Sequence, residues 1–241
     1  LETKEGICKK FINLIMWFSN ENKTLYAIWK KTITVTFNAN GASVASTSVS
    51  CDMYNTEESC SITSPVITRS GYTIVGYNTD SSATTSQWNS NTAKNVSANA
   101  TYNAITSKEL VANFNKNTVS SISATSSKCT IYNTQTSCTP TLPTITAQAN
   151  FTPQNWGTSA SQTSAGVTSI TLTASNTGST WYALNSRSLS WNFNKNTASS
   201  IATTSKTCTI WSTSGSCTIT TPVITAQTNF TEQGYGTSAD A

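Results

Sequence analysis

The sequence predicts a mainly β protein, organised as a tandem array of small β-sheet modules of about 78 residues that each contain a disulfide-closed hairpin. Three observations lead to this fold class. A motif recurs three times at a nearly constant period, a pair of cysteines occupies the same place in each copy, and short runs of β-branched and aromatic residues alternate with polar ones. Asn, Gly, Ser and Pro separate these runs, as expected of turns between strands.

The opening strand of each unit ends in a motif of phenylalanine and asparagine. Phe37, Phe114 and Phe193 begin the runs FNAN, FNKN and FNKN, 77 and 79 residues apart. A fixed period of this length is typical of repeat architectures. The period divides the chain into four parts: the tail of a preceding, shortened unit at 1–31, a first repeat at 32–107, a second at 108–186, and a truncated third at 187–241.

A cysteine pair follows each opening strand. Eight residues separate the two cysteines in every repeat. A two-residue turn midway, at Asn133-Thr134 in the second repeat, would place Cys129 opposite Cys138 at a separation that suits a disulfide. Three equal spacings predict three disulfides and an oxidising, extracellular location. The predicted pairs are Cys51 with Cys60, Cys129 with Cys138, and Cys208 with Cys217.

The remainder of each repeat contains a proline segment, an aromatic pair and a closing strand. The proline segments read SPVIT, LPTIT and TPVIT, and the closing strands read ATYNAI at 100–105 and STWYAL at 179–184. The related run TLYAIW lies at 24–29, in the tail, and the third repeat has no such strand. Apolar residues between Ile7 and Phe18 fall near helical spacing, which predicts a short helix there. Cys8 is a seventh cysteine, either paired with a residue outside this sequence or a buried free thiol.

Composition argues against several classes of function. Only 10% of the residues are charged and the net charge is +4 without any basic run, so we expect no binding of nucleic acid. The chain has no histidine, which removes the usual general base and metal ligand, and we expect no metal, no cofactor and no catalytic residue. Carboxylates suited to paired acid and base chemistry gather only in the first repeat, at Asp52, Glu57, Glu58 and Asp80. No apolar stretch is long enough to span a membrane.

The first repeat resembles a known family of surface repeats. The runs TITVTFNANGASV and SPVITRSGYTIVGYNTD, together with the ending TLYAIW, are similar to the internalin B-repeat (Listeria–Bacteroides repeat) family. The first repeat contains the Arg-x-Gly-Tyr motif at 69–72. The second and third repeats have the sequences AQANF at 147–151 and AQTNF at 226–230 in its place. The resemblance implies a small β-grasp-like module, carried in tandem on a bacterial cell surface as a spacer or adhesive stalk, with no catalytic residues and with neighbouring repeats as partners.

One aromatic residue in each hairpin is a candidate ligand contact. Tyr54, Tyr132 and Trp211 point away from the face of their cysteines, which Met53, Ile131 and Ile210 share. Such rings would bind glycans or a host protein weakly at each repeat and strongly across an array. The alternative, which we favour, is that they pack on the following proline or in the seam between repeats. A third possibility for the chain as a whole is a subunit of a self-assembling surface filament or layer.

Overall fold

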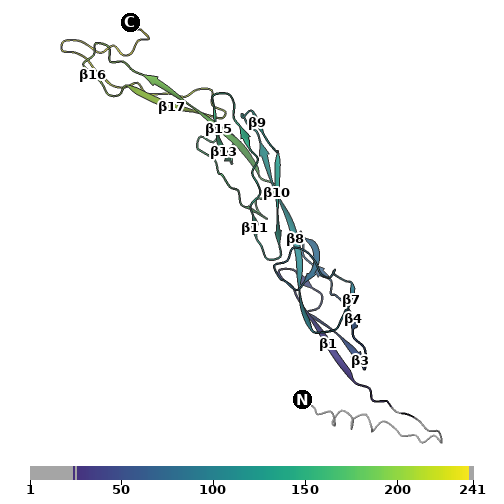
Figure 1. The fold of residues 1–241 in the computed structure, drawn as a ribbon. Coiled ribbons are helices and arrows are strands. Elements are labelled where there is room, and N and C mark those ends of the chain that lie inside the picture. The colour runs from purple at the N-terminus through teal and green to yellow at the C-terminus, as the bar shows by residue number, and fades with distance from the viewer. Residues whose placement is uncertain (1–23, 25, 239–241) are drawn as a thin grey trace.

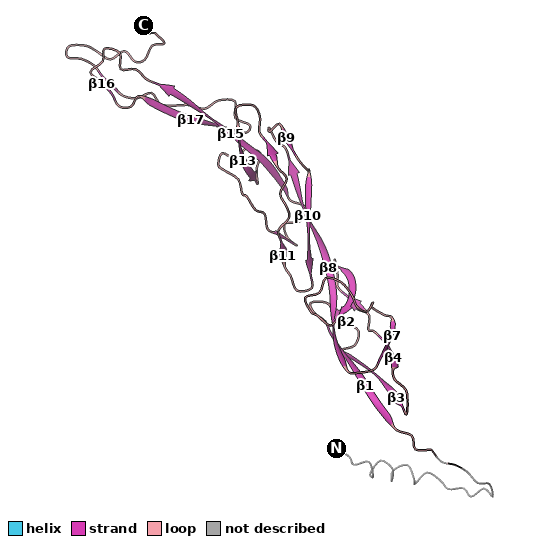
Figure 2. Cartoon of the chain, viewed as in Figure 1, coloured by secondary structure: helices cyan, strands magenta, loops and turns pink. Residues whose placement is uncertain are grey.

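The computed structural model describes residue 24 and residues 26–238. All regular elements in this part are strands, so the predicted mainly β fold class is confirmed (Figure 2). The helix expected between Ile7 and Phe18 and the seventh cysteine, Cys8, lie outside the described residues. The strands follow one another along a single elongated body, from β1 near the N-terminal end to β16 and β18 near the C-terminal end (Figure 1).

One eight-stranded sheet runs through the repeats, and the part of it in the first repeat has four strands in the order β3-β1-β8-β6. Its central strands, β1 (Lys30–Asn38) and β8 (Ala100–Asn115), run parallel. The flanking strands, β3 (Ser48–Tyr54) and β6 (Thr73–Asn78), pair antiparallel with β1 and β8 respectively. Two parallel central strands between antiparallel edges form the sheet of a β-grasp, in agreement with the predicted β-grasp-like module.

The second repeat has the same strand order, β10-β8-β15-β13. Here β8 is the opening strand and β15 (Thr180–Asn192) is its parallel partner. The flanking strands are β10 (Ser126–Tyr132) and β13 (Thr152–Gly157). In the third repeat, β15 pairs antiparallel with β17 (Ser205–Trp211) over its C-terminal half.

Five two-stranded sheets complete the structure. They are formed by strands of two to four residues that bring the proline segments and loops back against the main sheet. The pairs are β2 (Ser43–Val44) with β5 (Ile67–Thr68), β4 (Cys60–Thr63) with β7 (Ala93–Val96), β9 (Ser121–Ile122) with β12 (Ile145–Thr146), β11 (Ser137–Cys138) with β14 (Leu172–Thr173), and β16 (Ser200–Ile201) with β18 (Ile224–Thr225).

The phenylalanine of the repeated motif lies in the core of each of the first two repeats. Phe37 is almost fully buried, with its ring centroid 4.9 Å from that of Tyr77 and 5.6 Å from that of Trp88. Phe114 contacts Trp156 in the second core at 4.5 Å. The third repeat places Phe193 and Tyr235 5.0 Å apart. Aromatic pairs with tilted or edge-on geometry at these distances stabilise a core beyond their buried area alone.

All three predicted disulfides are formed, and the chain reverses between the two cysteines of each pair. We expected the two strands that carry the cysteines of a pair to form backbone hydrogen bonds with each other. This expectation is wrong in the first two repeats, because each of the two strands pairs with a different strand. Cys129 lies on β10 and faces Leu110, whereas Cys138 lies on β11 and faces Leu172. Each of the first two disulfides therefore joins the main sheet of its repeat to a small sheet, and holds the two layers together.

Candidate functional site: the joint between repeats

Long strands connect the repeats without a linker. β8 includes both the closing strand of the first repeat and the opening strand of the second, and it crosses the predicted boundary at 107/108. Its first half contributes Tyr102 and Ala104 to the first core, and its second half contributes Leu110 and Ala112 to the second. β15 crosses the boundary at 186/187 in the same way. A paired strand resists bending, so consecutive repeats are held in line.

Asn133 holds the first joint together. It lies in the turn after β10 with a positive φ of 52°, which asparagine tolerates better than most residues. Its backbone N–H donates to the Thr106 carbonyl at 2.9 Å, and its Oδ1 accepts from the Thr106 N–H at 3.1 Å. Its Nδ2 donates to the carbonyls of Ser81 and Ala83 at 2.9 and 3.1 Å. One side chain of the second repeat thus ties down a loop and a strand of the first.

Arg69 and Tyr72 contribute to the same joint from the other side. The Arg69 guanidinium lies 3.6 Å from the centroid of the Tyr72 ring and donates to the Thr106 Oγ1 at 2.8 Å and to the Asn133 carbonyl. Tyr72 belongs to the first repeat but packs against the core of the second. The Arg-x-Gly-Tyr sequence, which the resemblance singled out without a role, therefore connects two repeats.

The turn that contains this sequence is retained in the other repeats, where the residues differ. The Tyr72 N–H donates to the Arg69 carbonyl, and Phe151 and Phe230 donate in the same way to Gln148 and Gln227. Gly71 has a φ of 72°. Asparagine replaces it at both later positions, with φ values of 64° and 70° at Asn150 and Asn229. Sequence reasoning recognised only the aromatic positions, although the tolerance of asparagine for positive φ was a usable signal.

The second joint uses the same backbone contacts with different side chains. Ser212 takes the place of Asn133, and its N–H donates to the Asn185 carbonyl at 2.9 Å. Asn185 takes the place of Thr106 and is fully buried. Within the described residues its Nδ2 has no hydrogen-bond partner. Because an unsatisfied buried donor costs free energy, the Asn185 side chain stabilises this joint less than a fully hydrogen-bonded amide would.

The final asparagine of the repeated motif fixes a loop in each of the first two repeats. The Asn40 Nδ2 donates to the carbonyls of Ser81 and Ala104 at 2.8 and 3.1 Å. Asn117 makes the equivalent bonds to Ala160 and Ala183 at 3.0 and 3.2 Å. The Ser81 carbonyl accepts from both Asn40 and Asn133, so this loop links the motif of one repeat to the turn of the next.

The three candidate ligand contacts are not equally accessible. Tyr54 is 44% exposed, whereas Tyr132 and Trp211 are half-buried. Tyr132 pairs with Ser107 and Trp211 with Ser186, so both lie beside a crossing strand at a joint. Ile131 and Ile210, on the same face as the cysteines, are buried. A ligand-binding role for these aromatics stays a prediction.

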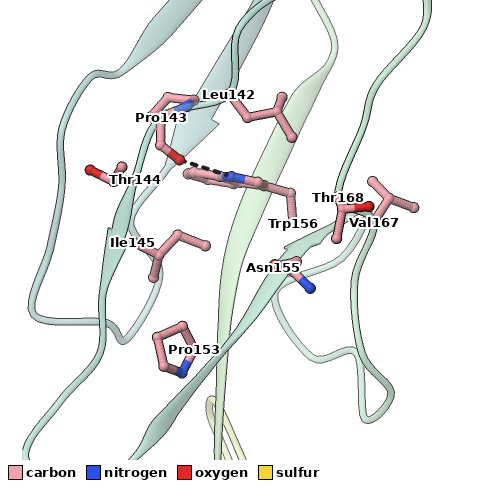
Figure 3. A pocket seen from close by; sticks show the side chains of 9 residues that line it. All are labelled: Leu142, Pro143, Thr144, Ile145, Pro153, Asn155, Trp156, Val167 and Thr168. Atoms are coloured by element: carbon pink, nitrogen blue, oxygen red, sulfur yellow. Dashed lines mark hydrogen bonds between the residues drawn. The ribbon is translucent and has the colours of Figure 1, made fainter.

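The second repeat has an open hollow of about 340 Å³ below its proline segment. Figure 3 shows the Trp156 indole between Leu142 and Ile145, and its Nε1 donates to the Pro143 carbonyl at 3.3 Å. Val167 occupies the position that Trp88 holds in the first repeat, because each forms a bridge with the core aromatic of its own repeat. No charged group lines the hollow, so it offers no acid or base chemistry.

Two of the carboxylates of the first repeat, Asp52 and Asp80, have structural partners. Asp52 accepts from Lys30 at 2.8 Å and from the Thr32 hydroxyl at 2.6 Å, and these hydrogen bonds lower the pKa of Asp52. Asp80 accepts from Ser82, which lowers the pKa of Asp80 in the same way. Within the described residues, no group of three His, Cys, Asp or Glu side chains is placed to bind a metal. None of the described elements is a helix that would cross a membrane.

Comparison with known proteins supports the resemblance of the first repeat. Residues 34–105 match the family described as the Listeria-Bacteroides repeat domain. No curated protein and no solved structure shows a significant match to the chain. The matched segment begins within β1 and ends within β8, so it spans the sheet of the first repeat. Residues 34–105 of this chain are therefore similar to the Listeria-Bacteroides repeat domain family.

Proposed function

We propose that the chain is a non-enzymatic extracellular repeat region of a bacterial cell-surface protein, where it acts as the stalk of an adhesin. The observation that carries this proposal is the pair of crossing strands, β8 and β15, which continue from one repeat into the next without a linker. A stalk has to keep its length under thermal motion. Hinges at the joints would defeat that purpose, and a strand paired on both sides of each joint opposes them.

The disulfides and the surface composition support an extracellular location. Three disulfides are stable in an oxidising compartment and would be reduced in most cytosols. A surface with few charges and many Ser, Thr and Asn residues offers little for nonspecific ionic attraction. The Listeria-Bacteroides repeat at residues 34–105 is consistent with this location.

Displaying the chain between a wall anchor and a terminal tag on a bacterial surface tests the stalk role. Deleting residues 108–186 joins Ser107 to Arg187, two positions that follow one another in the repeat register, and so preserves a continuous crossing strand. We expect immunogold on the tag to move towards the wall by one repeat length. Gold that stays at the same distance from the wall would contradict a stalk of fixed length.

A further inference from the structure

In each of the first two repeats, the strand that opens the repeat lies parallel to the strand that closes it. Residues 35–38 of β1 lie beside residues 100–103 of β8, and residues 113–115 of β8 lie beside residues 180–182 of β15. All three strands run along the long axis of the body (Figure 1). Two short overlaps of parallel strands, the first overlap (β1 with β8) and the second overlap (β8 with β15), therefore follow one another along the molecule.

The parallel arrangement determines how tension along the body would act on an overlap. The opening strand is pulled at its N-terminal end and the closing strand at its C-terminal end. In a parallel pair these two ends lie at opposite ends of the overlap, so the strands are made to slide past each other. Sliding stretches all the hydrogen bonds between the strands at once, whereas strands pulled apart from one shared end lose them one after another. The overlaps are therefore oriented to oppose extension along the body.

Side chains strengthen the first overlap. The Thr34 N–H donates to Asn99 Oδ1 at 2.8 Å, just beyond the backbone pairing of the two strands. Phe37 on β1 lies opposite Tyr102 on β8, and their buried rings are stacked with centroids 6.3 Å apart. Sliding of β1 along β8 would break the hydrogen bond and separate the two rings.

The second overlap is extended at the same positions by different residues. Val111 corresponds to Thr34, and its N–H donates to Thr177 Oγ1 at 3.0 Å. The Val111 carbonyl accepts from the Gly178 N–H at 2.7 Å. The Asn113 Nδ2 donates to the Gly178 carbonyl at 2.9 Å. The overlap is thus a feature of the repeat and is not peculiar to one joint.

The disulfide of the first repeat lies outside the first overlap. Cys51 and Cys60 belong to the segment between residues 38 and 100, which is not under tension while the overlap holds. Their Cα atoms are 6.0 Å apart, whereas the nine residue steps between them would span about 32 Å when extended. The disulfide therefore shortens the extension of the first repeat if its overlap separates.

We propose that the overlaps carry tension along the molecule, so that each of the first two repeats resists unfolding when the chain is pulled lengthwise. The biological use of this resistance rests on the proposed stalk. It adds a mechanical function to that role, because a stalk can keep its length against bending without resisting a pull. Forced unfolding depends on the barrier to unfolding and not on the free energy of unfolding. The resistance should therefore change with the direction of the pull, which ordinary stability does not.

Pulling the first repeat in two directions tests the proposal. Handles attached through noncanonical amino acids at Lys31 and Glu109 lie at opposite ends of the first overlap and make its strands slide. Handles at Lys31 and Ala98 lie at the same end and peel the strands apart. All three residues are exposed. In force spectroscopy of the full oxidised chain, we expect the unfolding force to be higher by about twofold or more for sliding than for peeling. Equal forces in the two directions would overturn the proposal.

Two matched substitutions separate the overlap from the rest of the sheet. Asn99 accepts from the Thr34 N–H within the overlap, whereas Ser50 on β3 hydrogen-bonds to Thr34 Oγ1 outside it. We expect Asn99→Ala to lower the sliding force, Asn99→Asp to restore it because an acceptor oxygen is retained, and Ser50→Ala to leave it unchanged. Equal losses for Asn99→Ala and Ser50→Ala would contradict the proposal. The immunogold distance that tests the stalk does not depend on these forces, so the stalk and the resistance to pulling can fail separately.

Discussion

At the scale of single residues, asparagine does most of the connecting in this molecule. Asn40 and Asn133 each adopt a positive φ, and each uses its side-chain amide to hold the loop that contains Ser81. A short amide both tolerates this backbone conformation and supplies two donors and an acceptor. The abundance of asparagine in the sequence therefore has a structural cause at these positions.

Asn133→Ala should weaken the first joint. The substitution removes the hydrogen bonds of the Asn133 side chain to the Ala83 carbonyl and the Thr106 N–H, and leaves the Ser81 carbonyl with Asn40 as its donor. We expect the free energy of unfolding to fall by about 1–3 kcal/mol. Denaturant unfolding measures this change. Asn55→Ala is the matched control, because Asn55 occupies the same turn in the first repeat but is exposed, and it should cost about 0.5 kcal/mol or less. Equal losses for the two variants would rule out a special role for Asn133.

Tyr77 should titrate late. Burial raises the pKa of its hydroxyl, which donates to the Pro65 carbonyl at 3.1 Å, to about 12. Since the unfolded chain would lose this proton near pH 10, the contribution of Tyr77 to stability is complete below pH 10 and is lost as the pH rises towards 12. The difference in tyrosinate absorbance between the original chain and Tyr77→Phe should therefore titrate near pH 12. A difference that titrates near pH 10 would show that this hydroxyl is solvated.

At the scale of elements, each disulfide of the first two repeats connects two sheets. Cys51 lies on β3 of the main sheet, and Cys60 lies on β4, which pairs with β7. Without the covalent bond, the short sheets would be held by two to four residue pairs of backbone and by the packing of a thin core. A cross-link between layers suits a module of this size, because small cores alone rarely supply enough stability.

Removing one disulfide should destabilise its repeat. Closing a ring of this size lowers the entropy of the unfolded chain by an amount equivalent to roughly 2.5–3 kcal/mol. We expect Cys129→Ser combined with Cys138→Ser to lower the unfolding free energy by about that amount, as measured by denaturant unfolding. Denaturant unfolding of the original chain under reductant, in which the disulfides are broken, provides the comparison. A double variant as stable as the original would mean that packing alone holds the two layers.

The sequence predicted the strands better than their partners. Alternating polarity identified the opening and closing strands, and equal spacing identified the three disulfides. Alternation says which residues are extended, but not which strand lies alongside, so the pairing of β4 with β7, more than thirty residues later, was not foreseen. The joint was missed for a similar reason. Asn133 resembles every other asparagine in an Asn-rich chain, and one partner of Arg69, the Asn133 carbonyl, lies in the next repeat.

At the scale of the whole molecule, the crossing strands determine the shape. Figure 1 shows β8 and β15 running along the body, where each connects one repeat to the next within a single sheet. The first half of each strand is buried in the core of one repeat, and its second half borders the core of the next repeat. Bending at a joint would have to break strand pairing on both sides of it. We therefore expect that neighbouring repeats do not hinge.

Distance measurements across the first joint test this claim most directly. Thr47 and Thr125 are exposed and occupy equivalent positions, since each accepts a backbone hydrogen bond from the phenylalanine of its own motif. Spin labels introduced there as noncanonical amino acids leave the disulfides intact, and electron paramagnetic resonance then gives their distance distribution. We predict a single narrow distribution, which becomes broad when a Gly-Ser linker is inserted after Ser107. A distribution that is already broad in the original chain would contradict the account.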